Sequence, residues 1–327
     1  MLLRHGETNY NVEHRFCGWS DARLTPKGKS TSSQAGRLLA LRGYTFDYVY
    51  ASELSRAVET AELVIEALDV APPESSFVRD WRLNERHYGA LQGQRKDSIE
   101  LAKEYGTDAI EDIRRSFKTR PPPLCDESHE TFSESVKRGL FSESLRDCEE
   151  RVREVWDEAI WPGLCMGKST LVVAHANTLR SLIKVIDGIN ENDIKHVWVP
   201  NSIPLVYPGH KLHSRLPYGS GVHDFHGQYI VTESNFEEVA HTYDKYEGRS
   251  ASHGGGLLRS LFDSLDTNGD GFIDADEIEA GVLRCRDSDV LRTLYSYDID
   301  GSGNISYDEF VVCLSAAETA SLFDILR

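Results

Sequence analysis

Two histidines stand where short apolar runs end, a placement that suits chemistry at the edge of a sheet. His5 closes the opening run MLLRH, and His175 closes the run STLVVAH. A neutral imidazole is a good nucleophile toward phosphorus when positive charge surrounds the incoming phosphoryl group. Arg4 and Arg56, which also lie at such junctions, can supply that charge through their guanidinium groups. These four residues predict a phosphoryl-transfer pocket, whereas the tripeptide RHG alone would equally suit a structural histidine.

The segment WRLNERHYG supplies an acidic side chain, Glu85, among basic neighbours. Arg82, Arg86 and His87 surround it in the sequence. A carboxyl group in such a setting can act as a general acid and base, or it can simply pair with the arginines. The residues alone leave both interpretations open.

Two acidic loops in the last quarter of the chain have the ligand spacing of calcium sites. The first, third, fifth, seventh, ninth and twelfth positions hold Asp266, Asn268, Asp270, Phe272, Asp274 and Glu277 in one loop, and Asp298, Asp300, Ser302, Asn304, Ser306 and Glu309 in the other. Gly271 and Gly303 stand at the sixth position, where the chain turns sharply. This is the EF-hand pattern, and it predicts two Ca²⁺ sites. The alternative is a pair of loops that packs without binding an ion.

The composition excludes several classes of function. A net charge of −17 argues against nucleic acid as the main partner. No apolar run approaches the roughly 20 residues that span a bilayer, and the first residues lack the pattern of a signal peptide. The six cysteines are scattered without the spacing of a disulfide framework or a zinc site. We therefore expect reduced thiols and a cytoplasmic location, with no membrane partner.

The elements that must position these residues are strands and helices in alternation. The runs 44–52 and 169–177 predict strands, and the periodic stretches 55–69 and 178–188 predict the helices that follow them. Strand–helix repetition predicts an α/β fold, with a mostly parallel sheet and helices on both faces. The three successive prolines within 119–130 predict a loop.

Length and composition divide the chain into two domains and a linker. A chain of 327 residues is too long for one ordinary core. We expect a catalytic domain over 1–231, a Gly- and Ser-rich linker over 232–256, and a small all-α EF-hand domain over 257–327.

Six segments occur in the order of one known family. They are LLRHGETNYNVEHRFCGWSDARLTPKGK, SELSRAVETAELV, WRLNERHYGALQGQRK, IRRSFKTRPPP, ESLRD and VAHANTLRSLIK. Together they resemble the cofactor-dependent phosphoglycerate mutases of the histidine phosphatase superfamily. The RHGE motif marks only the superfamily, whereas the segment around Glu85 and the basic segment before the prolines are more specific to the mutases.

The resemblance implies a function, a mechanism and a set of site residues. The family, a group of isomerases, interconverts 3-phosphoglycerate and 2-phosphoglycerate in glycolysis and gluconeogenesis and is primed by 2,3-bisphosphoglycerate. By this resemblance His5 is the nucleophile that becomes phosphohistidine, and Glu85 exchanges the proton on the substrate hydroxyl. Arg4, Arg56 and His175 would hold the phosphoryl group. The residues implied to line the substrate site are Asn11, Cys17, Gly18, Arg86, Tyr88, Lys96, Arg114, Arg115, Ala176 and Asn177.

Four features depart from the family pattern. The run before RHGE is short, and the segment 124–142 is shorter than in typical mutases. Cys17 replaces a usual Ser or Thr, and Ala176 replaces a usual Gly. A looser lid over the site would admit water to the phosphohistidine and favour a phosphatase.

Two alternatives to a mutase therefore stay open. One is a histidine phosphatase or bisphosphoglycerate synthase/phosphatase, and the other is a calcium sensor with an inactive mutase-like scaffold. The expected ligands are phosphoglycerates, 2,3-bisphosphoglycerate and Ca²⁺, while a homodimer and a helical peptide on the EF-hand pair are further partners to test. Because the EF-hand pair stands where the family has a C-terminal tail, we hypothesise that Ca²⁺ regulates the enzyme.

Overall fold

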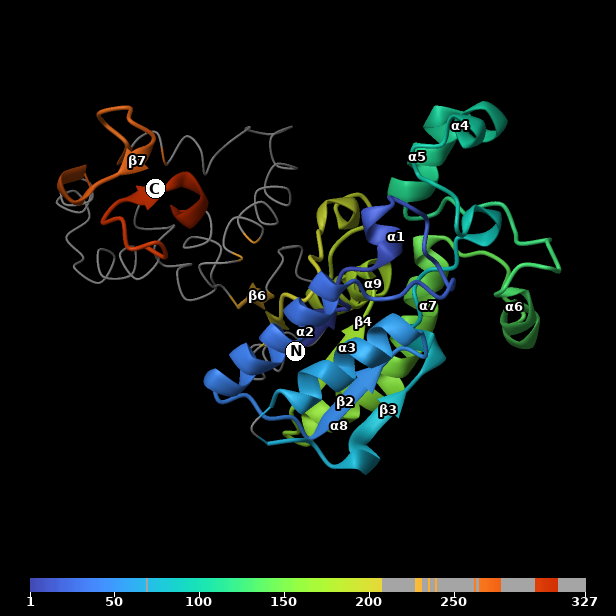
Figure 1. Cartoon of the computed structure of the whole chain (residues 1–327), viewed down its shortest axis with the longest axis horizontal. Helices are drawn as coiled ribbons and strands as arrows, with labels where there is room; N and C mark the ends of the chain where they lie inside the picture. Colours follow the sequence, from blue (N-terminus) through green and yellow to red (C-terminus); the bar gives the residue numbers. More distant parts are fainter. Residues whose placement is uncertain are drawn as a thin grey trace. The chain divides into compact units, whose positions relative to one another are not determined.

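The computed structural model describes residues 1–68, 70–207, 227–230, 235, 239, 262, 265–277 and 298–310 (Figure 1). The chain forms two compact units, Met1–Lys195 with Asn201–Gly227 and His196–Pro200 with Gln228–Arg327. Apart from residues 235 and 239, the linker expected over 232–256 lies outside the described residues. In the described part of the chain, no helix has the length and apolar character needed to cross a membrane.

A mostly parallel sheet forms the frame of the fold. Its strands are β1 (Leu2–Arg4), β2 (Tyr48–Ala51), β3 (Phe77–Arg79), β4 (Thr170–Ala174), β5 (Leu205–Val206) and β6 (Gln228–Tyr229). They are ordered β3-β2-β4-β1-β5-β6. The pairs β3–β2, β2–β4 and β4–β1 are parallel, and β1–β5 is antiparallel. Every residue of β4 is buried, as expected for a strand that is covered on both faces.

Between and after these strands, the described residues form α-helices. They are α1 (Asn9–Val12), α2 (Pro26–Leu41), α3 (Ser55–Glu66), α4 (Ile99–Tyr105), α5 (Thr107–Arg115), α6 (Phe132–Arg138), α7 (Leu145–Val155), α8 (Trp161–Cys165) and α9 (Ala176–Asp187). The chain moves from β1 to β2 to β3 in one direction across the sheet and then returns to β4. Right-handed crossovers then place α2 and α3 on one face and α7 to α9 on the other. The packing of α2 on α3 and of α7 on α9 agrees with this arrangement (Figure 1) and confirms the predicted fold class.

Short helical turns connect these elements. They are the 3₁₀ turns Glu74–Ser76, Trp81–Leu83, Gly89–Leu91 and Ile194–His196, and the π-helical turn Trp156–Ile160. The predicted strand over 44–52 is shorter in the structure, and the predicted helix over 55–69 ends at Glu66. The predicted loop around the prolines is confirmed, since no helix or strand lies within 119–130.

The loop after β1 is tied to the start of α2. Thr25 precedes this helix, and its hydroxyl accepts a hydrogen bond from the Gly28 amide. The same hydroxyl donates to Glu7 at 2.8 Å. Gly28 leaves no room for a side chain, because a Cβ there would lie 2.1 Å from the Glu7 carbonyl oxygen. The residues that follow His5 are therefore fixed against a helix end.

The second unit contains the two acidic loops. Strands β7 (Phe272–Ile273) and β8 (Ile305–Ser306) join them in an antiparallel pair, with Ile273 opposite Ile305. Phe262 packs edge-on against Tyr307 and Phe310. Most of the helical residues expected around the loops lie outside the described part of the chain.

Candidate active site and calcium loops

The end of β1 holds His5 firmly. Its amide donates to the Ala174 carbonyl at 3.0 Å, and its carbonyl accepts a 2.7 Å hydrogen bond from Asn201. The next amide, that of Gly6, donates to Thr60 Oγ1 on α3. The imidazole is buried, with 3% of its surface exposed. Backbone hydrogen bonds on both sides therefore fix the position of this ring.

The hydrogen bond made by the His5 ring determines which nitrogen is free to react. Nδ1 lies 2.7 Å from the Gly6 carbonyl oxygen. A carbonyl oxygen only accepts, so Nδ1 carries the proton and the lone pair is on Nε2. Burial, followed by the charges of Arg56 and Arg4, lowers the pKa of His5 well below its ordinary value. The ring is therefore a neutral imidazole with Nε2 available as a nucleophile.

His175 lies against His5, with the ring centroids 5.0 Å apart. It follows β4 directly, so the parallel pairing of β1 with β4 brings the two histidines together. Its Nε2 is 2.7 Å from Ser52 Oγ. Burial and the charge of Arg56 lower its pKa well below the ordinary value. A second neutral imidazole therefore lies beside His5, and its buried Nδ1 has no hydrogen-bond partner among the described residues.

Arg56, at the start of α3, is a fully buried cation. It donates to the carbonyl oxygens of Ser20 at 3.0 Å and Gly18 at 2.7 Å. Within the described residues no carboxylate pairs with it, and its buried Nε has no partner. A buried charge without a counterion is costly, so this arrangement favours the binding of an anion. Gly18 has a φ of +52°, which explains a glycine at this position.

Glu85 reaches the same region from a loop. Its Oε1 accepts hydrogen bonds from the amides of Arg86 at 2.8 Å and Asn177 at 3.2 Å. Asn177 lies in the first turn of α9, two residues after His175. Glu85 is buried, with 7% of the residue exposed, and both hydrogen bonds to its side chain from the described residues end on Oε1. Its second oxygen can therefore carry and transfer a proton.

A cationic and aromatic group surrounds this acid. The Arg86 guanidinium lies 4.3 Å from the centre of the Tyr88 ring, and Asn177 donates to the Tyr88 hydroxyl at 3.1 Å. Burial raises the pKa of Tyr88, but the charges of Arg86 and Lys96 outweigh burial and lower it. Arg86 is buried, and its Nε has no partner among the described residues. These residues form a positive surface next to Glu85.

Cys17, predicted to contact substrate, lies half-buried in the same region. Burial raises the pKa of its thiol, and the charges of Arg56, Glu85 and Lys96 also act on it. The thiol is therefore protonated at neutral pH and is not a nucleophile. Ala176, half-buried, begins α9 immediately after His175.

Three other predicted substrate residues have local partners instead. Asn11 caps α1, because its side chain accepts from the Thr8 amide. Arg114 and Arg115, on α5, both pair with Glu111 at 3.0 Å, and Arg114 is half-buried whereas Arg115 is exposed. Their placement gives no direct contact with the histidines.

One residue near the site was not among those predicted. Arg180 donates to the Asn177 side chain at 3.0 Å, and burial lowers the pKa of its guanidinium to about 10. The charges of Tyr88, Arg86 and Glu85 act on it. Its place one helical turn after Asn177 was the available signal, since residues three apart share a helix face.

The two acidic loops have the shape of calcium sites. The Gly271 amide donates to Asp266 Oδ2, and the Gly303 amide donates to Asp298 Oδ2, each at 2.9 Å. In the second loop, carboxylate oxygens of Asp298, Asp300 and Glu309 lie within 4.8 Å of one another. In the first, Glu277 is buried and accepts from the backbone amides of residues 267, 268 and 274. These oxygen ligands fit Ca²⁺, which prefers hard carboxylate and carbonyl groups.

Comparisons with known proteins agree with both regions. The model of the histidine phosphatase superfamily (branch 1) matches residues 1–203, and the model of the EF-hand domain pair matches residues 257–312. The 2,3-bisphosphoglycerate-dependent phosphoglycerate mutase of Blochmanniella pennsylvanica is 41% identical over 217 residues, which are 63% of this chain and 91% of that protein. The enzyme of the same name from Hamiltonella defensa is 40% identical over 214 residues, 63% of this chain and 84% of that protein.

A solved structure also resembles this chain. It is a mycobacterial glucosyl-3-phosphoglycerate phosphatase with a TM-score of 0.47 and 23% identity, over 63% of this chain and 90% of that one. On the sequence matches above, the chain belongs to the histidine phosphatase superfamily and, within it, to the family of 2,3-bisphosphoglycerate-dependent phosphoglycerate mutases, with an EF-hand pair in its C-terminal part.

Proposed function

We propose that this chain interconverts 3-phosphoglycerate and 2-phosphoglycerate through a phosphohistidine at His5, as an enzyme of glycolysis and gluconeogenesis. The observation that carries the proposal is the tautomer of His5. Its Nδ1 is held by the Gly6 carbonyl, so Nε2 has a free lone pair in a pocket with an unpaired buried cation, Arg56. Family membership supports the same reaction.

The first step is the transfer of a phosphoryl group to His5. A bond forms from Nε2 to phosphorus while the bond from phosphorus to the donor oxygen breaks. Arg56, Arg4 and the neutral His175 donate hydrogen bonds to the phosphoryl oxygens and stabilise the charge that develops there. The low pKa of His5 keeps the nucleophile unprotonated.

Glu85 moves the proton. The departing oxygen takes a proton from the carboxylic acid, and the carboxylate later takes one from the hydroxyl that accepts the phosphoryl group. In the primed enzyme the phosphohistidine passes its phosphoryl group to the free hydroxyl of 3-phosphoglycerate, which forms 2,3-bisphosphoglycerate. The other phosphoryl group then returns to His5, which leaves 2-phosphoglycerate and regenerates the phosphohistidine. The free enzyme receives its first phosphoryl group from 2,3-bisphosphoglycerate, which we propose as the priming cofactor.

The cationic residues next to Glu85 suit a small ligand with a carboxylate and one or two phosphates. Arg86, Lys96 and Arg180 supply charge, while Tyr88 and Asn177 supply polar groups. We propose that six further residues contact the substrate by closing around it when it binds. They are Asn11, Cys17, Gly18, Arg114, Arg115 and Ala176.

The experiment is a coupled enolase assay with and without 2,3-bisphosphoglycerate. We expect turnover of 3-phosphoglycerate that depends on priming, and an acid-labile phosphate on wild-type protein but not on His5→Gln. The matched control is His14→Asn, because asparagine tolerates the positive φ of +54° at that position. Steady release of inorganic phosphate without mutase turnover would indicate a phosphatase instead. No activity of either kind would indicate a calcium sensor on an inactive scaffold.

We also propose that the EF-hand pair binds Ca²⁺ and that the ion changes the activity of the enzyme. Calcium-bound EF-hands can expose an apolar groove, which takes an amphipathic helical peptide. Kinetics in EGTA and in excess Ca²⁺ test this, with Glu277→Gln/Glu309→Gln as the variant in which any difference disappears. Identical kinetics of the wild-type chain under both conditions would contradict regulation.

The remaining proposals concern the chain as a whole. We propose a catalytic domain over 1–231, a linker over 232–256 and an EF-hand domain over 257–327. A homodimer is the proposed assembly. The cysteines of the described residues, Cys17, Cys125, Cys148 and Cys165, are free, which supports a cytoplasmic location.

A further inference from the structure

Glu85 lies in a buried segment without regular secondary structure. The segment runs from Asn84 to Tyr88, between two 3₁₀ turns, and every one of its residues is buried. His5 and His175 follow strands whose ladders fix them, but Glu85 has no such ladder. Buried backbone groups need hydrogen-bond partners, so other groups must satisfy this segment.

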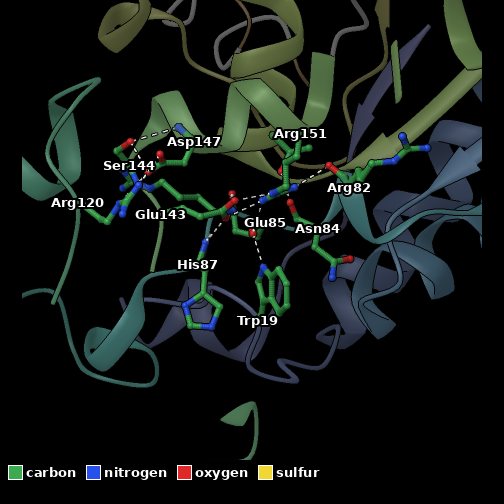
Figure 2. Close-up of polar contacts among 12 residues, drawn as sticks. Trp19, Arg82, Asn84, Glu85, His87, Arg120, Glu143, Ser144, Asp147 and Arg151 are labelled. Atoms are coloured by element: carbon green, nitrogen blue, oxygen red, sulfur yellow. Dashed lines mark hydrogen bonds and ion pairs between the residues drawn. The ribbon is translucent and has the colours of Figure 1, made fainter. Parts of the chain in front are cut away.

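Two oppositely charged side chains lie against the segment, as Figure 2 shows. Glu143 precedes α7, and Arg151 is on α7. Arg151 Nε lies 2.6 Å from Glu143 Oε1, and Nη2 lies 2.8 Å from Oε2. The side chains are 1% and 6% exposed, so the pair is a buried, bidentate ion pair.

Arg151 donates to the backbone on both sides of the acid. Its Nη1 donates to the Arg82 carbonyl at 2.6 Å, and its Nη2 donates to the Glu85 carbonyl at 3.0 Å (Figure 2). The guanidinium plane is rigid and is held by Glu143, so it fixes the distance between these two carbonyl oxygens.

Glu143 binds the same segment on the C-terminal side of Glu85. Its Oε2 accepts from the His87 amide at 2.8 Å, and its own amide donates to the His87 carbonyl at 2.9 Å. Trp19 Nε1 adds a 2.7 Å hydrogen bond to the Glu85 carbonyl (Figure 2). Three carbonyl oxygens, those of Arg82, Glu85 and His87, and the His87 amide are therefore hydrogen-bonded to Glu143 and Arg151.

We propose that Glu143 and Arg151 are positioning residues that hold the Glu85 carboxyl group in register with His5 and His175. The inference rests on the proposed function, because it assigns the pair to the proton-transfer step. The pair does not touch the transferred phosphoryl group, so its loss removes proton transfer while phosphoryl transfer to His5 remains.

A double variant separates this role from a merely structural one. Replacing both charged residues, as in Glu143→Leu/Arg151→Met, leaves no uncompensated buried charge and preserves side-chain volume, a change that is often tolerated. It removes every hydrogen bond that the two side chains make to the Glu85 segment. Arg146→Met/Glu150→Leu is the matched control, because that pair is on the same helix but is exposed.

Two phosphoryl donors distinguish proton transfer by Glu85 from phosphoryl transfer to His5. The glycerate oxygen needs a proton to leave, whereas 2,4-dinitrophenyl phosphate loses a phenolate that departs without one. For the double variant we expect kcat on 3-phosphoglycerate to fall about 100-fold, the effect of a small misplacement of a catalytic group. We expect the rate of His5 phosphorylation by 2,4-dinitrophenyl phosphate to change by less than about threefold.

Three outcomes would overturn or redirect the inference. A folded double variant that converts 3-phosphoglycerate at the wild-type rate would overturn the positioning role. Equal losses with both donors would also overturn it, because the damage would then reach the whole pocket. Wild-type protein that converts no 3-phosphoglycerate would contradict the proposed function instead. Arg151→Lys keeps a positive charge opposite Glu143 but loses the forked donors to the Arg82 and Glu85 carbonyls. It serves if the double variant does not fold, and it must show the same selective loss.

Discussion

We predict that the buried side chain of His87 makes the folded protein less stable in mild acid. Its ring is completely buried, with Nδ1 accepting from the Gly89 amide at 3.0 Å and Nε2 lying 3.0 Å from Ser135 Oγ. Because an amide only donates, the ring must be neutral with its proton on Nε2. Burial lowers the pKa of His87 to about 3, and the charges of Arg151 and His129 contribute in the same direction.

The size of the effect follows from this pKa. The unfolded chain binds the proton with an ordinary pKa of about 6.5, so below that pH the unfolded state takes up more protons than the native state. The contribution of the neutral His87 to the free energy of unfolding is therefore present above about pH 6.5 and is lost as the pH falls toward about 3. At pH 5 the loss due to His87 is about 2 kcal/mol.

The variant His87→Asn isolates this contribution. Asparagine can accept from the Gly89 amide but does not titrate, and it gives up the edge-on contact of the ring with Trp19 at 5.1 Å. We expect the variant to be less stable at pH 7. Between pH 7 and pH 5, however, the wild-type protein should lose about 2 kcal/mol more of its free energy of unfolding than the variant.

Urea unfolding at the two pH values, followed by tryptophan fluorescence, measures the difference. All other titrating groups, including His5 and His175, are common to both proteins and cancel in the subtraction. The fluorescence reports the region around His87, because Trp19 packs against it. Equal acid losses in the two proteins would refute the reasoning, since protonation of His87 would then not accompany unfolding.

Three further predictions test other parts of the structure. Thr60→Val removes the acceptor of the buried Gly6 amide, so we expect urea unfolding to show a loss of about 1–3 kcal/mol, whereas an unchanged midpoint would contradict the contact. Gly28→Ala places a Cβ against the Glu7 carbonyl, and thermal melting should show a loss of about 1–3 kcal/mol, whereas an unchanged melting temperature would contradict the close approach. Glu277→Gln and Glu309→Gln should each reduce calcium binding from two ions to one in calorimetric titration, and two remaining ions would contradict the ligand assignment.

The strand-end residues were accessible from sequence for a physical reason. A buried apolar run indicates a strand, and parallel strands bring their carboxyl ends to one edge of a sheet. His5 and His175 therefore meet because β1 and β4 are neighbours. The calcium loops were equally accessible, since one short segment supplies all the ligands of each loop, and in the structure Ile273 pairs with Ile305 between them.

Contacts between distant loops could not be predicted in the same way. Asn11 and Arg114 satisfy local groups in the structure, and sequence spacing carries no information on that choice. Arg180 was overlooked because an arginine on a helix is usually a solvated surface charge. The pair Glu143–Arg151 lies more than fifty residues from Glu85 along the chain, and no periodicity connects them.

The groups proposed to be catalytic are thus held by two different means. His5 and His175 need fixed ring positions. The backbone hydrogen bonds of the neighbouring strands fix them without further side chains. An acid that must reach across the phosphoryl group to the substrate oxygen cannot end a strand of the same sheet, because it would then lie beside the nucleophile. Glu85 comes instead from a buried loop, and a loop gains rigidity only from side-chain hydrogen bonds to its backbone. The guanidinium group of Arg151 therefore serves to position the loop that carries Glu85, because it donates to two backbone carbonyl oxygens there and to the Glu143 carboxylate.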